Sequence, residues 1–198
     1  MNTYKFKLFN FVGAPVELNI FFLVLFAITT PQIAIAIFIS ILLHEMAHAW
    51  MANRKGYNVY GIEISLFSGS AAIDTNIHER DSIPIIAAGP IINLLIFIVA
   101  FGLNHLYPTD FLYNLTWINL LLFSFNSLPI YPMDGGQILN DLLVRKMRNR
   151  TKAINIASIV SLFTSVILSI GSLLFGFYIM FIFSLYFIYI ACKKLNLF

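Results

Sequence analysis

Long stretches without any charged side chain are the strongest constraint on what this chain can fold into. Asp, Glu, Lys and Arg are absent from residues 18–43, 82–103 and 153–192. A helix needs about 20 apolar residues to cross the hydrocarbon core of a bilayer, so the last stretch is long enough for two helices. Charged residues make up 11% of the chain, which is too few to cover the surface of a soluble domain. We therefore expect an all-α polytopic membrane protein.

The sequence predicts about six transmembrane helices. The first is expected over residues 16–30 and ends at the turn Thr29-Thr30-Pro31-Gln32. The second is expected to end near residue 53. The third is expected over 82–103 and the fourth over 111–127. The fifth and sixth share the terminal stretch and are divided near Gly171-Ser172 or Gly176.

The basic residues predict the orientation of these helices. If the N-terminus is cytoplasmic, the cytoplasmic segments are 1–15, 54–81, 131–152 and 193–198, and they contain all twelve Lys and Arg. Because basic residues favour the cytoplasmic side, we expect a multi-pass protein of the cell (plasma) membrane with both termini inside. The net charge of +3 could suggest nucleic acid, but basic residues at the ends of apolar runs argue against that partner.

Residues 56–77 differ from the rest of the chain. Val59 to Leu66 alternate apolar and polar side chains, and Ser68-Gly69-Ser70 is typical of a turn. We expect a small β-hairpin or sheet near the cytoplasmic face. Its 59–67 segment is one place where an extended peptide could add as a strand.

The second predicted span contains His44-Glu45-Met46-Ala47-His48. Positions i and i+4 lie on one face of a helix, so both imidazoles can hold one zinc ion from the same side. Glu45 falls between them, where it can take a proton from the water that zinc activates. The histidines lie about 9 and 15 Å below the basic end of the span, a depth at which ionisable groups are usually functional. The alternative is that both histidines bond to neighbouring helices and Glu45 is a structural partner.

A hydrolytic zinc site needs a third protein ligand, and Asp134 is the candidate that stands out. Pro129 and Pro132 forbid a regular helix, so the fourth span must unwind before Asp134, and broken backbone at membrane depth usually lines a site. The alternative is that Asp134 caps the next helix. The remaining candidates are loop or span-end residues: His78, His105, Glu17, Glu63, Asp74 and Asp110.

The two motifs together resemble the paired signature of the site-2 protease family of intramembrane zinc metalloproteases. They are His44-Glu45-Met46-Ala47-His48 and Asn126-x-x-Pro129-x-x-Pro132-x-Asp134-Gly135, and Ala88-Gly89-Pro90 adds to the resemblance. The match covers roughly residues 38–140. The six-span layout is similar to that of the compact bacterial and archaeal members, including the sporulation-type protease that processes a membrane-tethered pro-sigma factor. The segment Leu66-Phe67-Ser68-Gly69-Ser70 departs from the Pro-Phe-Gly-Gly-like turn of many members.

The resemblance implies a site and an activity. His44, His48 and Asp134 would bind one Zn²⁺ per chain, and Glu45 would be the catalytic acid and base. Asn126 would contact the substrate backbone or the developing oxyanion, or else make a packing hydrogen bond. Asn93 is expected to serve packing only.

Residues 1–198 are then expected to form a single membrane-embedded metalloprotease domain. It would hydrolyse peptide bonds in or near transmembrane segments of membrane-tethered proteins such as regulators, pro-proteins or signal-peptide remnants. Its partners would be the lipid bilayer, that substrate and a regulatory membrane protein. The alternatives are a non-catalytic zinc-binding membrane protein or a metal transporter. A prenyl-protein protease fits poorly, since its third ligand is a downstream glutamate and none occurs after Glu79.

Overall fold

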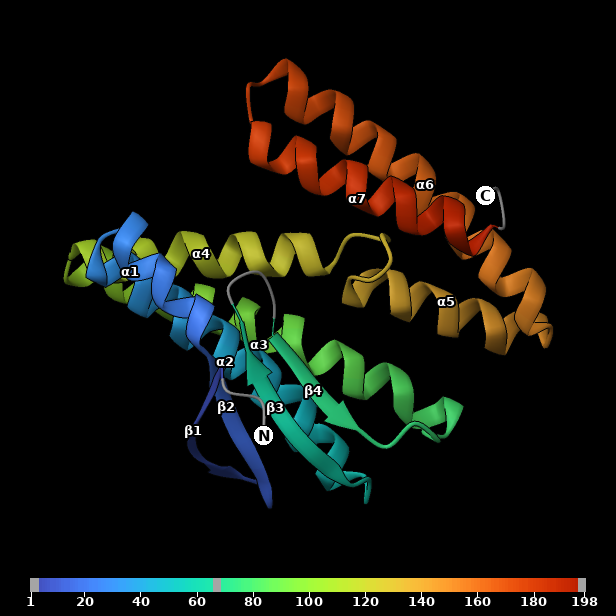
Figure 1. The fold of residues 1–198 in the computed structure, drawn as a ribbon, viewed down its shortest axis with the longest axis horizontal. Helices are drawn as coiled ribbons and strands as arrows, with labels where there is room; N and C mark the ends of the chain where they lie inside the picture. The colour runs from blue at the N-terminus through green and yellow to red at the C-terminus, as the bar shows by residue number, and fades with distance from the viewer. Residues whose placement is uncertain (1–3, 66–68, 196–198) are drawn as a thin grey trace. The chain divides into compact units, whose positions relative to one another are not determined.

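The computed structural model describes residues 4–65 and 69–195, which are mostly helical and include one four-stranded sheet (Figure 1). Backbone contacts group the chain into two compact units, Met1–Phe123 and Ser124–Phe198. In chain order the elements are β1 (Lys5–Phe11), β2 (Ala14–Asn19), η1 (Ile20–Leu23), α1 (Val24–Ile28), α2 (Pro31–Arg54), β3 (Val59–Ile64), β4 (Gly69–Ile73), α3 (Glu79–Leu106), α4 (Asp110–Asn126), α5 (Asp134–Met147), α6 (Arg150–Leu174) and α7 (Tyr178–Lys194).

The sheet of the first unit has the order β1-β2-β3-β4. β1 with β2 and β3 with β4 are antiparallel, whereas β2 and β3 are parallel. A parallel pair needs a long crossover, and η1, α1 and α2 provide it. The predicted hairpin is confirmed as β3 and β4. The expected turn falls partly on 66–68, outside the described residues, and Gly69 already belongs to β4.

The prediction of one helix over residues 16–30 is wrong. Residues 14–19 form β2, which pairs with β1 on one side and β3 on the other, so its backbone hydrogen bonds are satisfied in the sheet. After β2 come a short 3-10 turn and the five-residue helix α1, far below the roughly 20 residues that a span needs. The absence of charge identified this segment as apolar but could not distinguish a buried strand from a helix.

Three of the described helices, α2, α3 and α6, are long and apolar enough to cross a membrane. α4 and α7 match the predicted fourth and sixth spans in position, but each has only 17 residues, so the count of six spans is not confirmed. The predicted division of the terminal stretch lies at Gly176, whose φ of +75° suits glycine at the turn between α6 and α7.

Helix α2 is fixed against the sheet. It begins at the cap residue Thr30, whose side chain accepts from Ile33 N, with Pro31 in the first turn. It packs on β3 and β4 and lies beside α3. The buried core of this unit comes from both layers: Val16, Phe22, Leu25, Ala34, Ala49, Ile62 and Ile64.

The second unit contains α5, α6 and α7. α6 and α7 lie side by side as a helical hairpin, and α5 packs against α6 (Figure 1). Small buried side chains form one stripe along α6: Ala153, Ala157, Ser158, Ser161, Ser165, Ser169 and Ser172. Such a stripe lets neighbouring helices approach closely.

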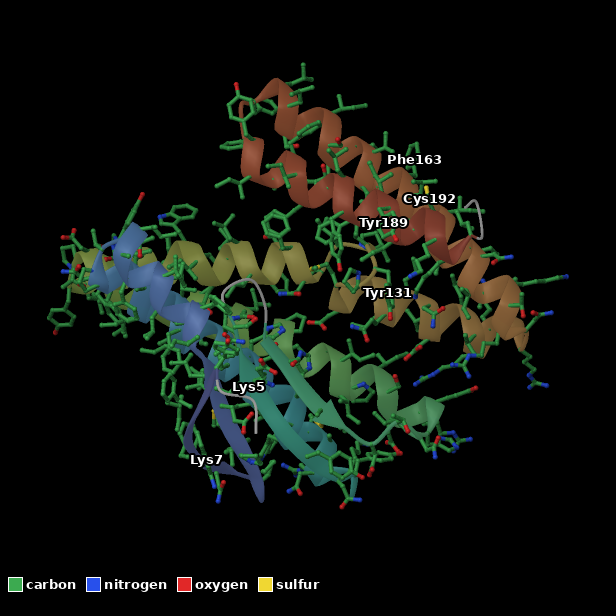
Figure 2. The ribbon with its side chains drawn as sticks, viewed as in Figure 1. Lys5, Lys7, Tyr131, Phe163, Tyr189 and Cys192 are labelled. Atoms are coloured by element: carbon green, nitrogen blue, oxygen red, sulfur yellow. The ribbon has the colours of Figure 1, made fainter. Side chains whose placement is uncertain are left out.

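An ion pair ties the N-terminal strand to the middle of the sheet. Lys5 of β1 donates to Glu63 of β3, and Asn19 Nδ2 donates to the other oxygen of Glu63 at 3.4 Å. Figure 2 labels Lys5 and Lys7, the two lysines of β1. The hydrogen bond from Lys5 lowers the pKa of Glu63 below its usual value. The Glu63 carboxylate therefore stabilises the fold at pH values above the ordinary pKa of glutamate. This stabilisation is lost as the pH falls through the lowered pKa of Glu63.

We expect Glu63→Gln to loosen β1, because the charge that attracts Lys5 is removed. Hydrogen exchange of the β1 amides, corrected for the intrinsic rate, should be faster in the variant at pH 7. The difference from wild type should shrink below about pH 4, where glutamates become protonated. Glu17→Gln removes the same charge from β2 but keeps the Lys5–Glu63 pair, so it is the control. Equal β1 exchange in wild type and Glu63→Gln at pH 7 would contradict this role.

Candidate metal centre

Two histidines of α2 place their imidazoles side by side. His44 and His48 are one helical turn apart and are 7% and 8% exposed. Their Nε2 atoms are 3.1 Å apart. Two nitrogens that bind one zinc ion tetrahedrally at about 2.0–2.1 Å lie roughly 3.3 Å from each other. The pair is therefore spaced as two ligands of one metal ion.

The second nitrogen of each ring is held by α3. His48 Nδ1 lies 2.8 Å from the carbonyl oxygen of Ile85, and His44 Nδ1 lies against Asn93 Oδ1. A carbonyl oxygen can only accept, so Nδ1 of His48 carries the hydrogen and its Nε2 presents a lone pair. The same applies to His44 if Oδ1 of Asn93 is the acceptor. Two lone pairs this close repel each other unless a cation lies between them, which is the arrangement of a metal ligand pair.

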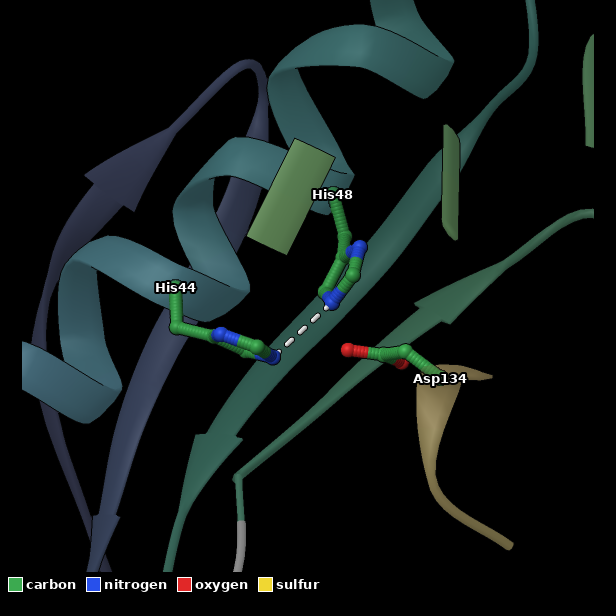
Figure 3. Close-up of side chains that lie close together, drawn as sticks. All are labelled: His44, His48 and Asp134. Carbon is green, nitrogen blue, oxygen red and sulfur yellow. Dashed lines mark hydrogen bonds between the residues drawn. The ribbon is translucent and has the colours of Figure 1, made fainter. Parts of the chain in front are cut away.

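Asp134 supplies a carboxylate to the same place. It is the first residue of α5 and is 8% exposed. One ligand atom from each of His44, His48 and Asp134 lies within 4.8 Å of the other two. Figure 3 shows the two imidazoles of α2 and this carboxylate directed toward one another. The residue in the cap position of α5 is Met133, with no side-chain cap, so the alternative that Asp134 is the N-cap is wrong.

The loop before Asp134 is folded tightly onto the first turn of α5. α4 ends at Asn126, as the two prolines predict, and residues 127–133 are not helical. A Cβ on Gly135 would lie 2.5 Å from Ser127 O, and one on Gly136 would lie 2.5 Å from the carbonyl carbon of Ile130. Only glycine allows this contact, which explains the Asp-Gly-Gly sequence.

The same loop is fastened to the helical hairpin of its own unit. Tyr131 N donates to Ser161 Oγ of α6 at 3.0 Å. The ammonium group of Lys194, at the end of α7, lies over the ring of Tyr131, which Figure 2 labels. Asn126 is half-buried at the end of α4, where the loop begins.

The remaining candidate ligands have other roles among the described residues. His78 caps α3 by accepting from Arg80 N, and His105 is exposed in the last turn of α3. Asp74 accepts from Tyr60 Oη at 2.6 Å and from the backbone of Asn58. A metal in this chain is therefore best served by the buried group of two imidazole nitrogens and one carboxylate oxygen, a donor set that suits zinc.

Two glycines on neighbouring elements leave room for the side chains of His44, His48 and Glu45. A Cβ on Gly89 of α3 would lie 2.7 Å from His44 Cε1 and closer still to the ring of His48. A Cβ on Gly69 of β4 would lie 2.5 Å from Oε1 of Glu45, which is 7% exposed. The two imidazoles thus pack on the backbone of α3, and the Glu45 carboxylate packs on the first residue of β4.

Two of these positions could not be connected to the site by sequence reasoning. Asn93 is expected from its sequence context to serve packing only, but it contacts His44 directly. Gly69 is expected in a turn, not against Glu45. A fully buried amide within an apolar span is a signal that could have pointed to Asn93, because such groups are retained where they hold something in place.

Comparison with known proteins agrees with this geometry. The model of peptidase family M50 matches residues 32–108 and 104–168, which contain His44, Glu45, His48 and Asp134. The chain belongs to peptidase family M50. The resemblance to site-2 proteases is confirmed by the solved structure of the site-2 protease from Methanocaldococcus jannaschii. That structure has a TM-score of 0.71 and 27% identity and covers 97% of this chain and 95% of its own.

Two curated relatives give a measure of sequence similarity within this M50 family. A zinc metalloprotease of M. jannaschii is 30% identical over 159 residues, 72% of this chain and 47% of that protein. A Synechocystis protein is 32% identical over 147 residues, 71% of this chain and 39% of its own length. The chain thus spans less than half of either relative. The family and the buried donor group together support Zn²⁺ as the cofactor.

We expect Gly89→Ala to lower the zinc content of the purified M50 protein. The new methyl group would push the two imidazoles apart or separate α3 from α2, and either change spoils the ligand pair. Gly102→Ala, on the same helix, is the matched control, since a Cβ there would contact no neighbouring group within 4 Å among the described residues. The measurement is metal content per chain by mass spectrometry after dialysis. Full zinc content in a folded Gly89→Ala variant would contradict the packing described for the rings.

Proposed function

We propose that this chain is an intramembrane zinc metalloprotease that hydrolyses peptide bonds in or near transmembrane segments of membrane-tethered proteins. The observation that carries the proposal is the buried group of His44, His48 and Asp134, with Glu45 next to it on a helix apolar enough to cross a membrane. Membership of peptidase family M50 supports the same activity.

We assign the metal to His44 Nε2, His48 Nε2 and a carboxylate oxygen of Asp134. A zinc ion supplies Lewis acidity: it makes water acidic enough to lose a proton near neutral pH and polarises a carbonyl oxygen. Glu45 takes the proton of the attacking water and delivers it to the amine that leaves. Asn126, at the break after α4, donates its amide to the substrate backbone or the developing oxyanion.

The Glu45 carboxylate lies against Gly69, so the strand that starts there is well placed to guide a substrate. A helical peptide bond is covered by its own backbone, so a substrate segment must become extended before it is cut. The 59–67 segment is expected from its sequence to take such a segment, but β3 is paired on both sides. Among the described residues, β4 is an edge strand of the sheet, with no strand paired on its outer side. We infer that the substrate adds as a strand to β4.

The proposed topology is based on the basic residues. We propose a multi-pass protein of the cell membrane with about six membrane-crossing segments and cytoplasmic termini. β2, η1 and α1 would together make the first crossing in place of the predicted helix, so that all twelve Lys and Arg lie on one side. Water would reach the site from the cytoplasmic side. Substrate access would be controlled by the membrane part itself or by a regulatory membrane partner.

We expect Glu45→Gln to retain zinc and to lower cleavage of a membrane-tethered reporter by at least about 100-fold, since a general base typically contributes about 10²–10⁴. Asp134→Ala should instead lose zinc, because a ligand is removed. Glu79→Gln and Asp141→Ala are matched controls on α3 and α5 and should change neither property. Released fragment and metal per chain are measured in parallel. Wild-type cleavage by Glu45→Gln would refute the catalytic assignment, and a protein that moves zinc without cutting would be a transporter.

We expect strand addition to give a recognisable cross-linking pattern. Ser70 of β4 is exposed, so a Ser70→Cys variant made in a Cys192→Ser, Glu45→Gln background should form disulfides with single cysteines placed along the substrate. Reactive substrate positions should alternate, because successive side chains of a strand point to opposite faces. Leu8→Cys on β1, the other edge of the sheet, is the control. Equal cross-linking from both edges would argue against β4.

A further inference from the structure

Three polar side chains near His44 are completely buried and come from three different helices. Ser40 of α2, Asn93 of α3 and Asn119 of α4 are each 0% exposed. Burying an amide is unfavourable unless its donors and acceptor find partners. The way these partners are arranged determines what His44 can do.

The arrangement begins at two backbone carbonyls. Asn119 Nδ2 donates to Leu115 O at 2.8 Å and to Ser40 Oγ at 2.8 Å. Ser40 Oγ in turn donates to Ala36 O at 2.6 Å. Carbonyl oxygens only accept, so the amide group of Asn119 that faces Leu115 must be its NH₂ and its Oδ1 must face the other way.

The orientation of the Asn119 amide fixes that of Asn93, and Asn93 in turn contacts the imidazole of His44. Asn119 Oδ1 faces Asn93 Nδ2 at 2.8 Å, so Asn93 must present its NH₂ there, and the same group donates to Ser40 O at 3.4 Å. Asn93 Oδ1 is then left facing His44 Nδ1. An acceptor at this point selects the tautomer with hydrogen on Nδ1, which leaves the lone pair of Nε2 directed at the metal position.

We propose that Asn93, Asn119 and Ser40 are positioning residues that fix the tautomer and orientation of the His44 ring for metal binding. The proposal rests on the proposed function, since it assumes that His44 is a zinc ligand. Residues of α3 and α4 that do not contact the metal then set its affinity. Flipping either amide would place two donors or two acceptors face to face, so the chain of bonds has one stable direction.

His48 differs from His44 in how it is held. Its Nδ1 donates directly to the backbone oxygen of Ile85, and a backbone carbonyl has only one polarity. His48 therefore needs no side chain to choose its tautomer. Substitutions in the network should act on the metal site through His44 alone.

The test compares zinc affinity by chelator competition, and the absorption spectrum of the Co²⁺-loaded protein, in purified full-length variants. We expect Asn93→Leu to weaken zinc binding about 10–100-fold, the range found when partners of metal-bound histidines are removed. Asn119→Leu and Ser40→Ala should weaken it in the same direction and alter the Co²⁺ spectrum. Asn93→Asp keeps an acceptor for His44 Nδ1 but sets its second oxygen against Asn119 Oδ1, so it should bind zinc less tightly than wild type and more tightly than Asn93→Leu. A merely structural role would favour apolar Leu over charged Asp at this buried position.

Thr116→Val is the matched control. Thr116 is 2% exposed on α4 and donates to Leu112 O, so the variant removes a buried polar group of this helix outside the network. It should keep wild-type zinc affinity. Wild-type affinity and spectrum in folded Asn119→Leu and Ser40→Ala would overturn the inference, as would loss of zinc in Thr116→Val to the same extent. A wild-type protein that binds no zinc would refute the proposed function itself.

Discussion

The structure depends on how ionisable side chains are kept inside apolar helices. Each imidazole of α2 uses one nitrogen to donate to α3 and leaves the other for a shared point, where the carboxylate of Asp134 also lies. Without these hydrogen bonds and a cation, the burial of three such groups would be strongly unfavourable. The packing of α2 against α3 therefore serves two purposes. α3 shields the two histidines from lipid and also orients their rings.

Close approach of backbone to side chain is what makes this arrangement fit. Gly89 lets α3 lie on the two rings, and Gly69 lets β4 lie on the Glu45 carboxylate. Gly135 and Gly136 do the same for the loop that precedes α5. In each case a Cβ would enter space already filled by a side chain of the candidate site or by the backbone of the loop before α5. Because glycine has no side chain, the backbone can pack directly on these groups. A larger residue at any of these positions would displace them.

The sheet has a structural and a functional consequence. β2 and β3 are parallel, so the chain must cross from one to the other, and α2 is part of that crossover. The helix that carries His44 and His48 is thereby packed on β3 and β4, and Glu45 is brought to the start of an edge strand. The proposed substrate strand on that edge would therefore begin next to the proposed base.

The sequence by itself determined the apolar character of the chain, the helix with His44 and His48 on one face, and the break before Asp134. These features are local: a charge-free run, a spacing of four residues and two prolines each act within one segment, so they can be recognised without a fold. The strand at residues 14–19, the edge position of β4 and the contact of Asn93 with His44 were decided by the tertiary structure. They depend on which distant segments become neighbours, and an apolar run or a single asparagine carries no information about its partner.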